Sequence, residues 1–183
     1  MSVFGVSHVV LTPSFTSDTL NRVSADFAWL GAATGFGALI GALAAGSFTQ
    51  KASLLRGASL AIPYCLGLLV FSRVTDFVIA LFIQVFVGFF YIASFTTLQV
   101  VVQEVVSDNF RGRVMSLFQI AWAGLVPIGS LVMGLMASEY GFGLGSANTI
   151  GLTALICLGY VVWVVVSNYS RIHNPLPKRP QHD

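Results

Sequence analysis

The sequence predicts an all-α integral membrane protein, a bundle of five full transmembrane helices preceded by a truncated N-terminal one. Apolar residues make up 56% of the chain and charged residues only 9%, whereas about a quarter of the residues in a soluble domain are charged. Five long stretches lack Asp, Glu, Lys and Arg, and about 20 apolar residues suffice to cross a bilayer as a helix. Their apolar runs are continuous, which favours helices because barrel strands alternate.

The N-terminal segment, residues 1–12, is apolar but too short to span a membrane. It has neither a basic region nor a small-residue cleavage site, so it does not resemble a signal peptide. We interpret it as the outer half of a helix whose first half is missing; a short helix at the membrane interface is the alternative. Residues 13–25 are polar and typical of a turn.

The five full spans are expected at about 27–49, 54–72, 77–101, 114–138 and 147–168, so residues 1–168 form one transmembrane domain. Residues 169–183 are rich in Pro and charge, and we expect a disordered cytoplasmic tail there. Five spans leave seven basic residues on the side of the tail and two on the other, which predicts a multi-pass protein of the cytoplasmic (inner) membrane with a cytoplasmic C-terminus. The seven are Lys51, Arg56, Arg111, Arg113, Arg171, Lys178 and Arg179, and the two are Arg22 and Arg73.

The first and fourth spans carry small residues four positions apart, a spacing that lets two helix backbones approach closely in lipid. Two interpretations stay open: ordinary tight packing, or a seam on which another helical bundle rocks. The predicted seam residues are Gly31, Gly35, Gly37, Gly41, Ser130 and Gly134.

Polar side chains in the third and fourth spans recur at helical spacing and are expected to face protein or a cavity, because polar groups in lipid are costly. The alternative is that the amides only join neighbouring helices, and that the histidine of residues 1–12 lies at the outer interface. The cavity-lining candidates are His8, Gln84, Tyr91, Gln119 and Trp122.

The remaining two spans offer little polarity. The fifth is nearly all apolar from Leu152 to Val166, and the second is nearly as apolar, so both are expected to face lipid. Cys65 and Cys157 lie inside apolar runs and are expected to be buried thiols.

A specific motif lies between the third and fourth spans, where an acidic turn precedes Arg-Gly-Arg and Val-Met-Ser. This stretch resembles the loop before the eleventh helix of the major facilitator superfamily, in exporters of the enterobactin-exporter and macrolide-efflux type. The segment FGVSHVVLTPSF is similar to the end of their seventh helix. The matching cytoplasmic loop residues are Asp108, Arg111, Gly112 and Arg113.

The resemblance implies the second six-helix half of such a fold. It implies a secondary exporter that moves a small amphipathic molecule by alternating access, with the lipid bilayer, the substrate and the missing N-terminal half, or an equivalent helical bundle, as partners. A truncated non-transporting or regulatory membrane protein is the alternative. With no metal-spaced His or Cys cluster, nucleophile elbow or paired carboxylate, the sequence does not predict an enzyme. We expect no cofactor, no metal and no nucleic-acid partner.

Overall fold

The computed structural model describes residues 7–49, 53–138 and 141–173, and within these ranges the regular structure is entirely helical. Five of the helices are long and apolar enough to cross a membrane, which confirms the predicted fold class and a multi-pass membrane protein. In chain order the elements are η2 (Ser7–Leu11), α1 (Thr12–Asp18), η3 (Ser24–Asp26), α2 (Phe27–Thr49), α3 (Leu54–Phe71), α4 (Phe77–Val105), α5 (Asp108–Ala137) and α6 (Gly145–His173).

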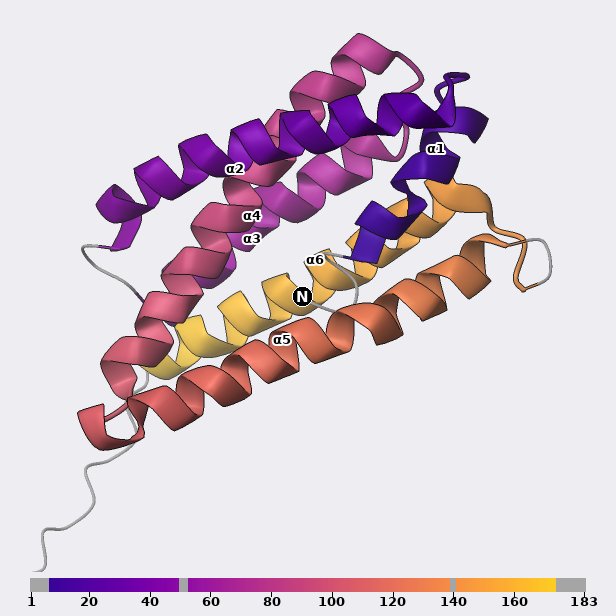
Figure 1. Cartoon of the computed structure of the whole chain (residues 1–183). Coiled ribbons are helices and arrows are strands. Elements are labelled where there is room, and N and C mark those ends of the chain that lie inside the picture. The colour runs from indigo at the N-terminus through magenta and orange to yellow at the C-terminus, as the bar shows by residue number, and fades with distance from the viewer. Residues whose placement is uncertain (1–6, 50–52, 139–140, 174–183) are drawn as a thin grey trace, which may run out of the picture.

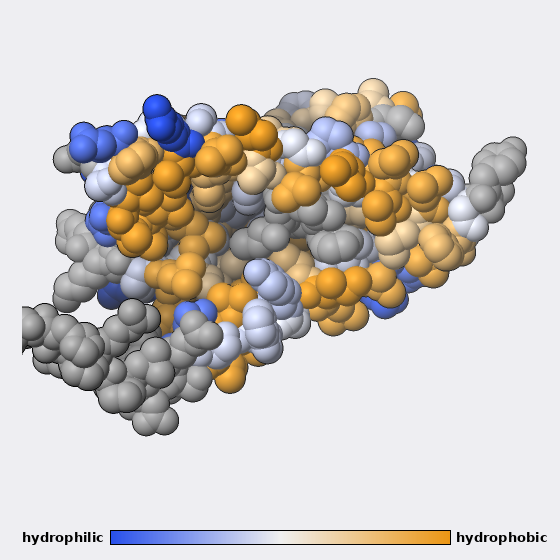
Figure 2. Space-filling view, turned by 90° about the horizontal axis from the view of Figure 1, so that it is seen from below, coloured by the Kyte–Doolittle hydropathy of each residue, from blue (hydrophilic) through white to orange (hydrophobic). Residues whose placement is uncertain are grey.

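The long helices lie side by side in one bundle (Figure 1). α4 packs against α2 and α3, and α3 packs against α6, while α5 contacts mainly η2 and α6. α2 and α5 lie at opposite edges of this view, with η2 and α1 on the α5 side of α2. Apolar side chains cover much of the face seen in Figure 2, as expected for a surface in contact with lipid.

Two helix starts follow from local chemistry. The Asp76 carboxylate accepts hydrogen bonds from the backbone N–H groups of Val78 and Ile79, at 2.9 and 3.0 Å, and so caps α4. The Ser53 hydroxyl caps α3 by accepting from the N–H of Arg56 at 3.2 Å. These side chains satisfy N–H groups that the first turn of a helix leaves without partners.

The structure differs from the expected organisation before the first span. Thr12–Asp18, expected to be part turn, is the helix α1, because Pro13 is tolerated in a first turn. The Thr16 hydroxyl donates to the Thr12 carbonyl at 2.7 Å, and the Phe15 ring lies 4.6 Å from the ring of Phe71, centroid to centroid. Together η2 and α1 form a short helical segment with one side buried against the bundle.

Helix ends differ as well. α5 begins at Asp108, so the Arg-Gly-Arg motif forms its first turns rather than a loop. α6 continues to His173, so the first residues of the expected tail are helical, and 174–183 lie outside the described residues. Exposed Arg side chains permit the longer α5, because they can reach the headgroups from a helix end.

The helices differ in the fraction of their residues that is buried, and hydropathy did not predict which helices are the most buried. In the most apolar stretch of each helix, 44% of the residues of α3 are buried, against 17% in α2 and 11% in α5. α3 was expected to face lipid, yet only one side of it does, through Leu66 and Val70. Its other side packs into a core with α4 and α6 that contains Tyr64, Cys65, Leu68, Val87, Ala154, Cys157 and Val161. Both cysteines are free thiols.

Candidate functional site

The glycines of the predicted seam fall into two groups. A Cβ atom added at Gly41 would lie 2.5 Å from the carbonyl oxygen of Phe89 on α4, and one at Gly37 would meet the carbonyl of Val85 even more closely. From the other side, Gly88 of α4 faces the Thr34 carbonyl of α2. The backbones of α2 and α4 therefore approach so closely that only glycine fits at these positions.

The other predicted seam residues are open. Cβ atoms added at Gly31, Gly35 or Gly134 would meet no atom within 4 Å, and Ser130 is half-buried. These positions leave room for contacts that the described residues do not make.

The close approach of α2 and α4 places a buried amide beside a hydroxyl. The Gln84 side chain is only 2% exposed, and the Thr34 hydroxyl lies 3.3 Å from its Oε1 atom. The same hydroxyl lies 2.8 Å from the Leu30 carbonyl of its own helix. Because a buried amide without partners costs free energy, this contact helps to hold Gln84 within the bundle.

Gln84 and Thr34 line a cavity of about 240 Å³ between η2, α1, α2 and α4, which we call the outer cavity. His8 and Tyr91 also line it, together with the open glycines Gly31 and Gly35. Three of the predicted cavity residues, His8, Gln84 and Tyr91, are therefore brought together. The His8 ring is buried and lies edge-on to the Tyr64 ring at 6.5 Å.

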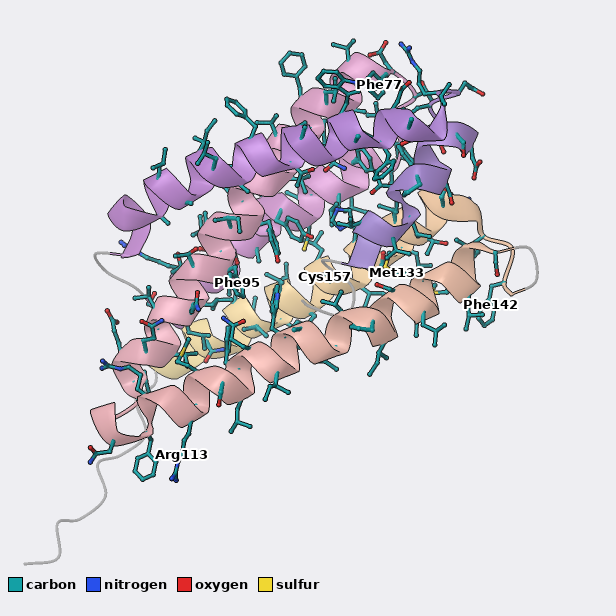
Figure 3. The ribbon with its side chains drawn as sticks, viewed as in Figure 1. Phe77, Phe95, Arg113, Met133, Phe142 and Cys157 are labelled. Atoms are coloured by element: carbon teal, nitrogen blue, oxygen red, sulfur yellow. The ribbon has the colours of Figure 1, made fainter. Side chains whose placement is uncertain are left out.

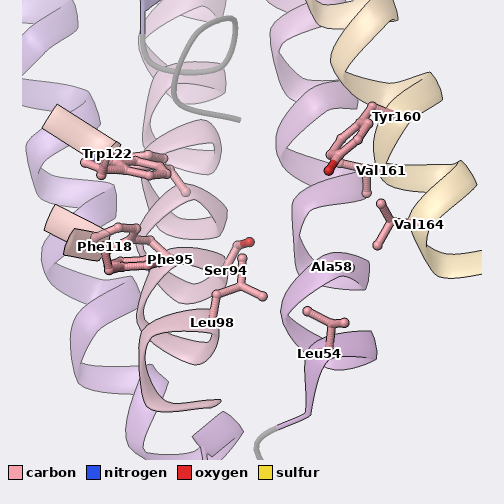
Figure 4. Close-up of a pocket in the computed structure, with 11 residues that line it drawn as sticks. Leu54, Ala58, Ser94, Phe95, Leu98, Phe118, Trp122, Tyr160, Val161 and Val164 are labelled. Carbon is pink, nitrogen blue, oxygen red and sulfur yellow. The ribbon is translucent and has the colours of Figure 1, made fainter. Parts of the chain in front are cut away.

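A second cavity of about 230 Å³, the inner cavity, lies between α3, α4, α5 and α6 (Figure 4). Tyr91 lines it as well as the outer cavity, and Trp122 of α5 lies against it. The Trp122 ring lies 6.2 Å from the Tyr91 ring, between centroids. Phe95 projects from α4 toward the space between α4, α5 and α6 (Figure 3). The other lining residues are Leu54, Ala58, Ser94, Leu98, Phe118, Tyr160, Val161 and Val164.

The structure does not bring every predicted residue to these cavities. Gln119 is exposed and lines neither of them. Phe118, one full turn before Trp122, shares the inward face of α5 instead. The start of α5 carries three exposed motif residues, Arg111, Gly112 and Arg113. Arg113 lies at the opposite end of α5 from Met133 (Figure 3). The side chain of Asp108 is not among the described residues.

Sequence reasoning missed Thr34, Tyr64 and Tyr160. Thr34 lies three residues before Gly37 and seven before Gly41, so helical spacing could have placed it on the same face. Tyr64 and Tyr160 lie in spans that are apolar overall, so one hydroxyl group in each did not stand out. Nothing in the sequence pattern distinguishes their positions.

The two cavities are lined by few polar groups. The described residues that line the two cavities contribute hydroxyl groups, one amide, one indole and one imidazole, and among them there is no carboxylate, lysine or arginine. Such a lining suits a molecule with an apolar body and a few hydrogen-bonding groups.

One of three comparisons with known proteins gives a match. A family model described as transmembrane secretion effector, of the major facilitator type, matches residues 1–177. Neither the comparison with curated proteins nor that with solved structures gives a match.

Proposed function

Because the chain belongs to the transmembrane secretion effector family of the major facilitator superfamily, and is therefore a membrane transporter protein, we propose that it forms one bundle of a secondary-active exporter. The exporter moves a small amphipathic molecule across the cytoplasmic membrane by alternating access. In that mechanism two bundles rock around a site near the middle of the membrane. One observation carries the proposal most directly: a buried Gln84 amide, Thr34 and His8 together line a cavity inside an otherwise apolar bundle.

The second bundle, in this proposal, docks on the edges formed by α2 and α5. These two helices are the least buried of the five spans, and the open glycines Gly31, Gly35 and Gly134 lie on them. Small residues without neighbours allow another helix to approach and to slide. The second bundle is either the N-terminal half of the same transporter or an equivalent set of helices.

A transport assay tests the role of the outer cavity. In cells that express the chain together with its second bundle, Gln84→Leu should reduce efflux of fluorescent amphipathic dyes at least tenfold, because it removes the amide that the substrate would contact. The matched variant Gln119→Leu changes the same residue type at an exposed position and should leave efflux within twofold of the wild type. These factors correspond to roughly 1.4 and 0.4 kcal/mol in the transport barrier.

Equal efflux by both variants would contradict the assignment of the outer cavity. Absence of efflux by the wild-type assembly for every dye would favour the alternative, a non-transporting or regulatory membrane protein.

The proposed orientation places the C-terminus in the cytoplasm and the α1–α2 connection outside, on the bias of basic residues. Single cysteines at Ser17 and Ser170, in a Cys65→Ala and Cys157→Ala background, should react with an impermeant thiol reagent from opposite sides of the membrane. In intact cells Ser17→Cys should be labelled and Ser170→Cys should not. Equal labelling at the two positions would rule out this topology.

A further inference from the structure

A groove of about 450 Å³ runs along the bundle between α3 and α4, and we call it the α3–α4 groove. Its lining residues on α3 are Leu66, Gly67 and Val70, and those on α4 are Ile79, Phe82, Ile83 and Phe86. All of these residues are apolar. From Ile79 to Phe86 the groove extends about 10 Å along α4, at about 1.5 Å per residue. It therefore has the length and the chemistry to hold a flexible apolar chain that lies along the bundle.

The shape of the groove follows from a glycine. A Cβ atom added at Gly67 would lie 2.9 Å from the Cγ2 atom of Val87 and 3.1 Å from the Cδ1 atom of Phe86. Gly67 is thus the point at which α3 comes closest to this part of α4, and it is buried. Leu66 and Val70 on either side of it are exposed. The groove is a channel with a glycine at its floor and apolar side chains at its edges.

The groove lies on the outside of the bundle. Gly88 of α4 contacts α2 and follows Phe86 by two residues, so about 200° separate these two positions around the helix. Leu68 of α3 packs in the core shared with α6 and follows Leu66 by the same spacing. The groove therefore faces away from both α2 and α6. It also lies apart from the start of the described chain, because η2 packs on α5 and α6.

A basic residue lies at one end of the groove. Arg73 follows the last groove residue of α3, and its backbone N–H donates to the Val70 carbonyl at 3.0 Å. The Arg73 side chain is exposed, and arginine side chains reach headgroups from a helix end. The nearby carboxylate of Asp76 accepts from the N–H groups of Val78 and Ile79. An anionic group beside the bundle can therefore pair with Arg73.

We propose that the α3–α4 groove binds an anionic phospholipid of the surrounding bilayer, with one acyl chain along the groove and the phosphate at Arg73. The two edges of the groove surround a chain more closely than a flat helix face does, so the chain gains more dispersion contacts. A second copy of the protein fits less well, because apolar protein surfaces have no hydrophobic driving force to associate in lipid. The inference goes beyond the proposed function and does not rest on export.

Bromine on an acyl chain quenches the fluorescence of an indole that it touches, which allows a test in vesicles. The full chain contains three tryptophans, and the W29F/W122F/W163F variant has none. In this background Phe86→Trp places a reporter at the groove and keeps an aromatic ring there. The vesicles contain equal amounts of phosphatidylglycerol, which is anionic, and phosphatidylcholine, and one of the two lipids is brominated at a time.

Phe36→Trp in the same background is the matched control reporter. Phe36 and Phe86 are both exposed phenylalanines, and Phe36 lies on α2, outside the groove. Gly37 lies against Val85 of α4, so the two reporters stand at similar heights along the bundle. A difference between them therefore reports the groove rather than the depth in the bilayer.

At Phe86→Trp we expect phosphatidylglycerol to bind about fivefold more tightly than phosphatidylcholine, as the attraction of one basic residue for an anionic headgroup predicts. At Phe36→Trp we expect no preference. Arg73→Gln should abolish the preference at the groove. Arg22→Gln is the control for charge, since the Arg22 guanidinium lies over the Phe77 ring at 5.0 Å, and it should leave the preference intact.

The acyl chain is tested by filling the groove. Val70→Phe puts a ring into it and should reduce quenching of the Phe86→Trp reporter by both brominated lipids. Val78→Phe is the matched control, because Val70 and Val78 are 54% and 56% exposed and only Val70 lines the groove. Leu66→Trp, on the facing helix, is a second reporter and should show the same lipid preference as Phe86→Trp.

Three results would overturn the proposal. An equal preference at the Phe86→Trp and Phe36→Trp reporters would reduce the groove to ordinary bilayer contact. A preference that survives in folded Arg73→Gln protein, or quenching that survives Val70→Phe, would remove the headgroup or the chain from the site. Weak quenching at Phe86→Trp by both lipids, with strong quenching at Phe36→Trp, would show that protein covers the groove instead.

Discussion

The helices α2 and α5 carry the same small-residue pattern and use it differently. α2 is interlocked with α4, where Gly37, Gly41 and Gly88 leave no room for a Cβ atom. On α5, a Cβ atom added at Gly134 would meet no atom within 4 Å. Small residues four apart thus permit close approach in both helices, but a tight interface arises only where a partner backbone lies opposite. The pattern by itself does not tell an internal seam from an external one.

A pair of substitutions two residues apart on α2 distinguishes its interlocked face from its open face. Gly37→Leu should destabilise the bundle by more than the roughly 1–3 kcal/mol typical of overpacking, because the side chain would meet the Val85 backbone, which cannot rotate away. Gly35→Leu should leave stability within about 0.5 kcal/mol, as expected of an open surface position. Thermal unfolding of the purified chain in detergent measures both, and equal unfolding temperatures would show that the α2–α4 contact is not tight.

The external seam is tested by function rather than stability. Gly134→Leu should leave the unfolding temperature of the chain unchanged but reduce dye efflux at least tenfold in the two-bundle assembly, about 1.4 kcal/mol, because a large side chain would block the approach of the second bundle. Gly159→Leu is a suitable control, since Gly159 is equally open on α6. Full efflux with Gly134→Leu would remove α5 from the proposed seam.

A smaller effect is expected at the start of α5. Arg111 and Arg113 are exposed there, and anionic headgroups attract basic residues by about 1 kcal/mol each. Arg111→Ala should lower efflux severalfold while membrane insertion, measured by cell-surface labelling of Ser17→Cys, stays normal. Arg111→Lys should restore most of the loss, and unchanged efflux with Arg111→Ala would leave the arginine with only a role in orientation.

The presence of five long apolar helices could be predicted from the sequence, because hydropathy and the spacing of charges can be read directly along the chain. The five spans appear near their expected positions, and the differences lie at their ends, where α4 reaches Val105 and α5 begins at Asp108. Charge-free stretches mark the membrane core, whereas a helix continues beyond it for as long as its side chains reach water or headgroups. The extra turns of α5 therefore could not be predicted from hydropathy.

The site was less accessible to sequence reasoning. Helical spacing placed Gln84 and Tyr91 on one face of α4, and both line the outer cavity. The partner of Gln84, Thr34, lies fifty residues away, and only the packing of α2 on α4 brings the two together. Gln119 was predicted to face inward, because helical spacing places it on the same face as Trp122. The rotation of α5 about its axis depends on the neighbouring helices, and it leaves Gln119 exposed.

The interlocked pair of α2 and α4 also constrains how the protein is made. α3 and two connections are synthesised between the two helices, so at roughly 5–20 residues per second α4 is complete some seconds after α2. During that interval the Thr34 and Gly37 face of α2 has no partner, and when α4 arrives its Gln84 amide needs one. Retention of α2 beside the translocation channel until α4 emerges would let the Gln84 amide enter the bilayer already beside the Thr34 hydroxyl. The close contact that glycines allow between α2 and α4 can therefore form only after the whole of α3 has been made.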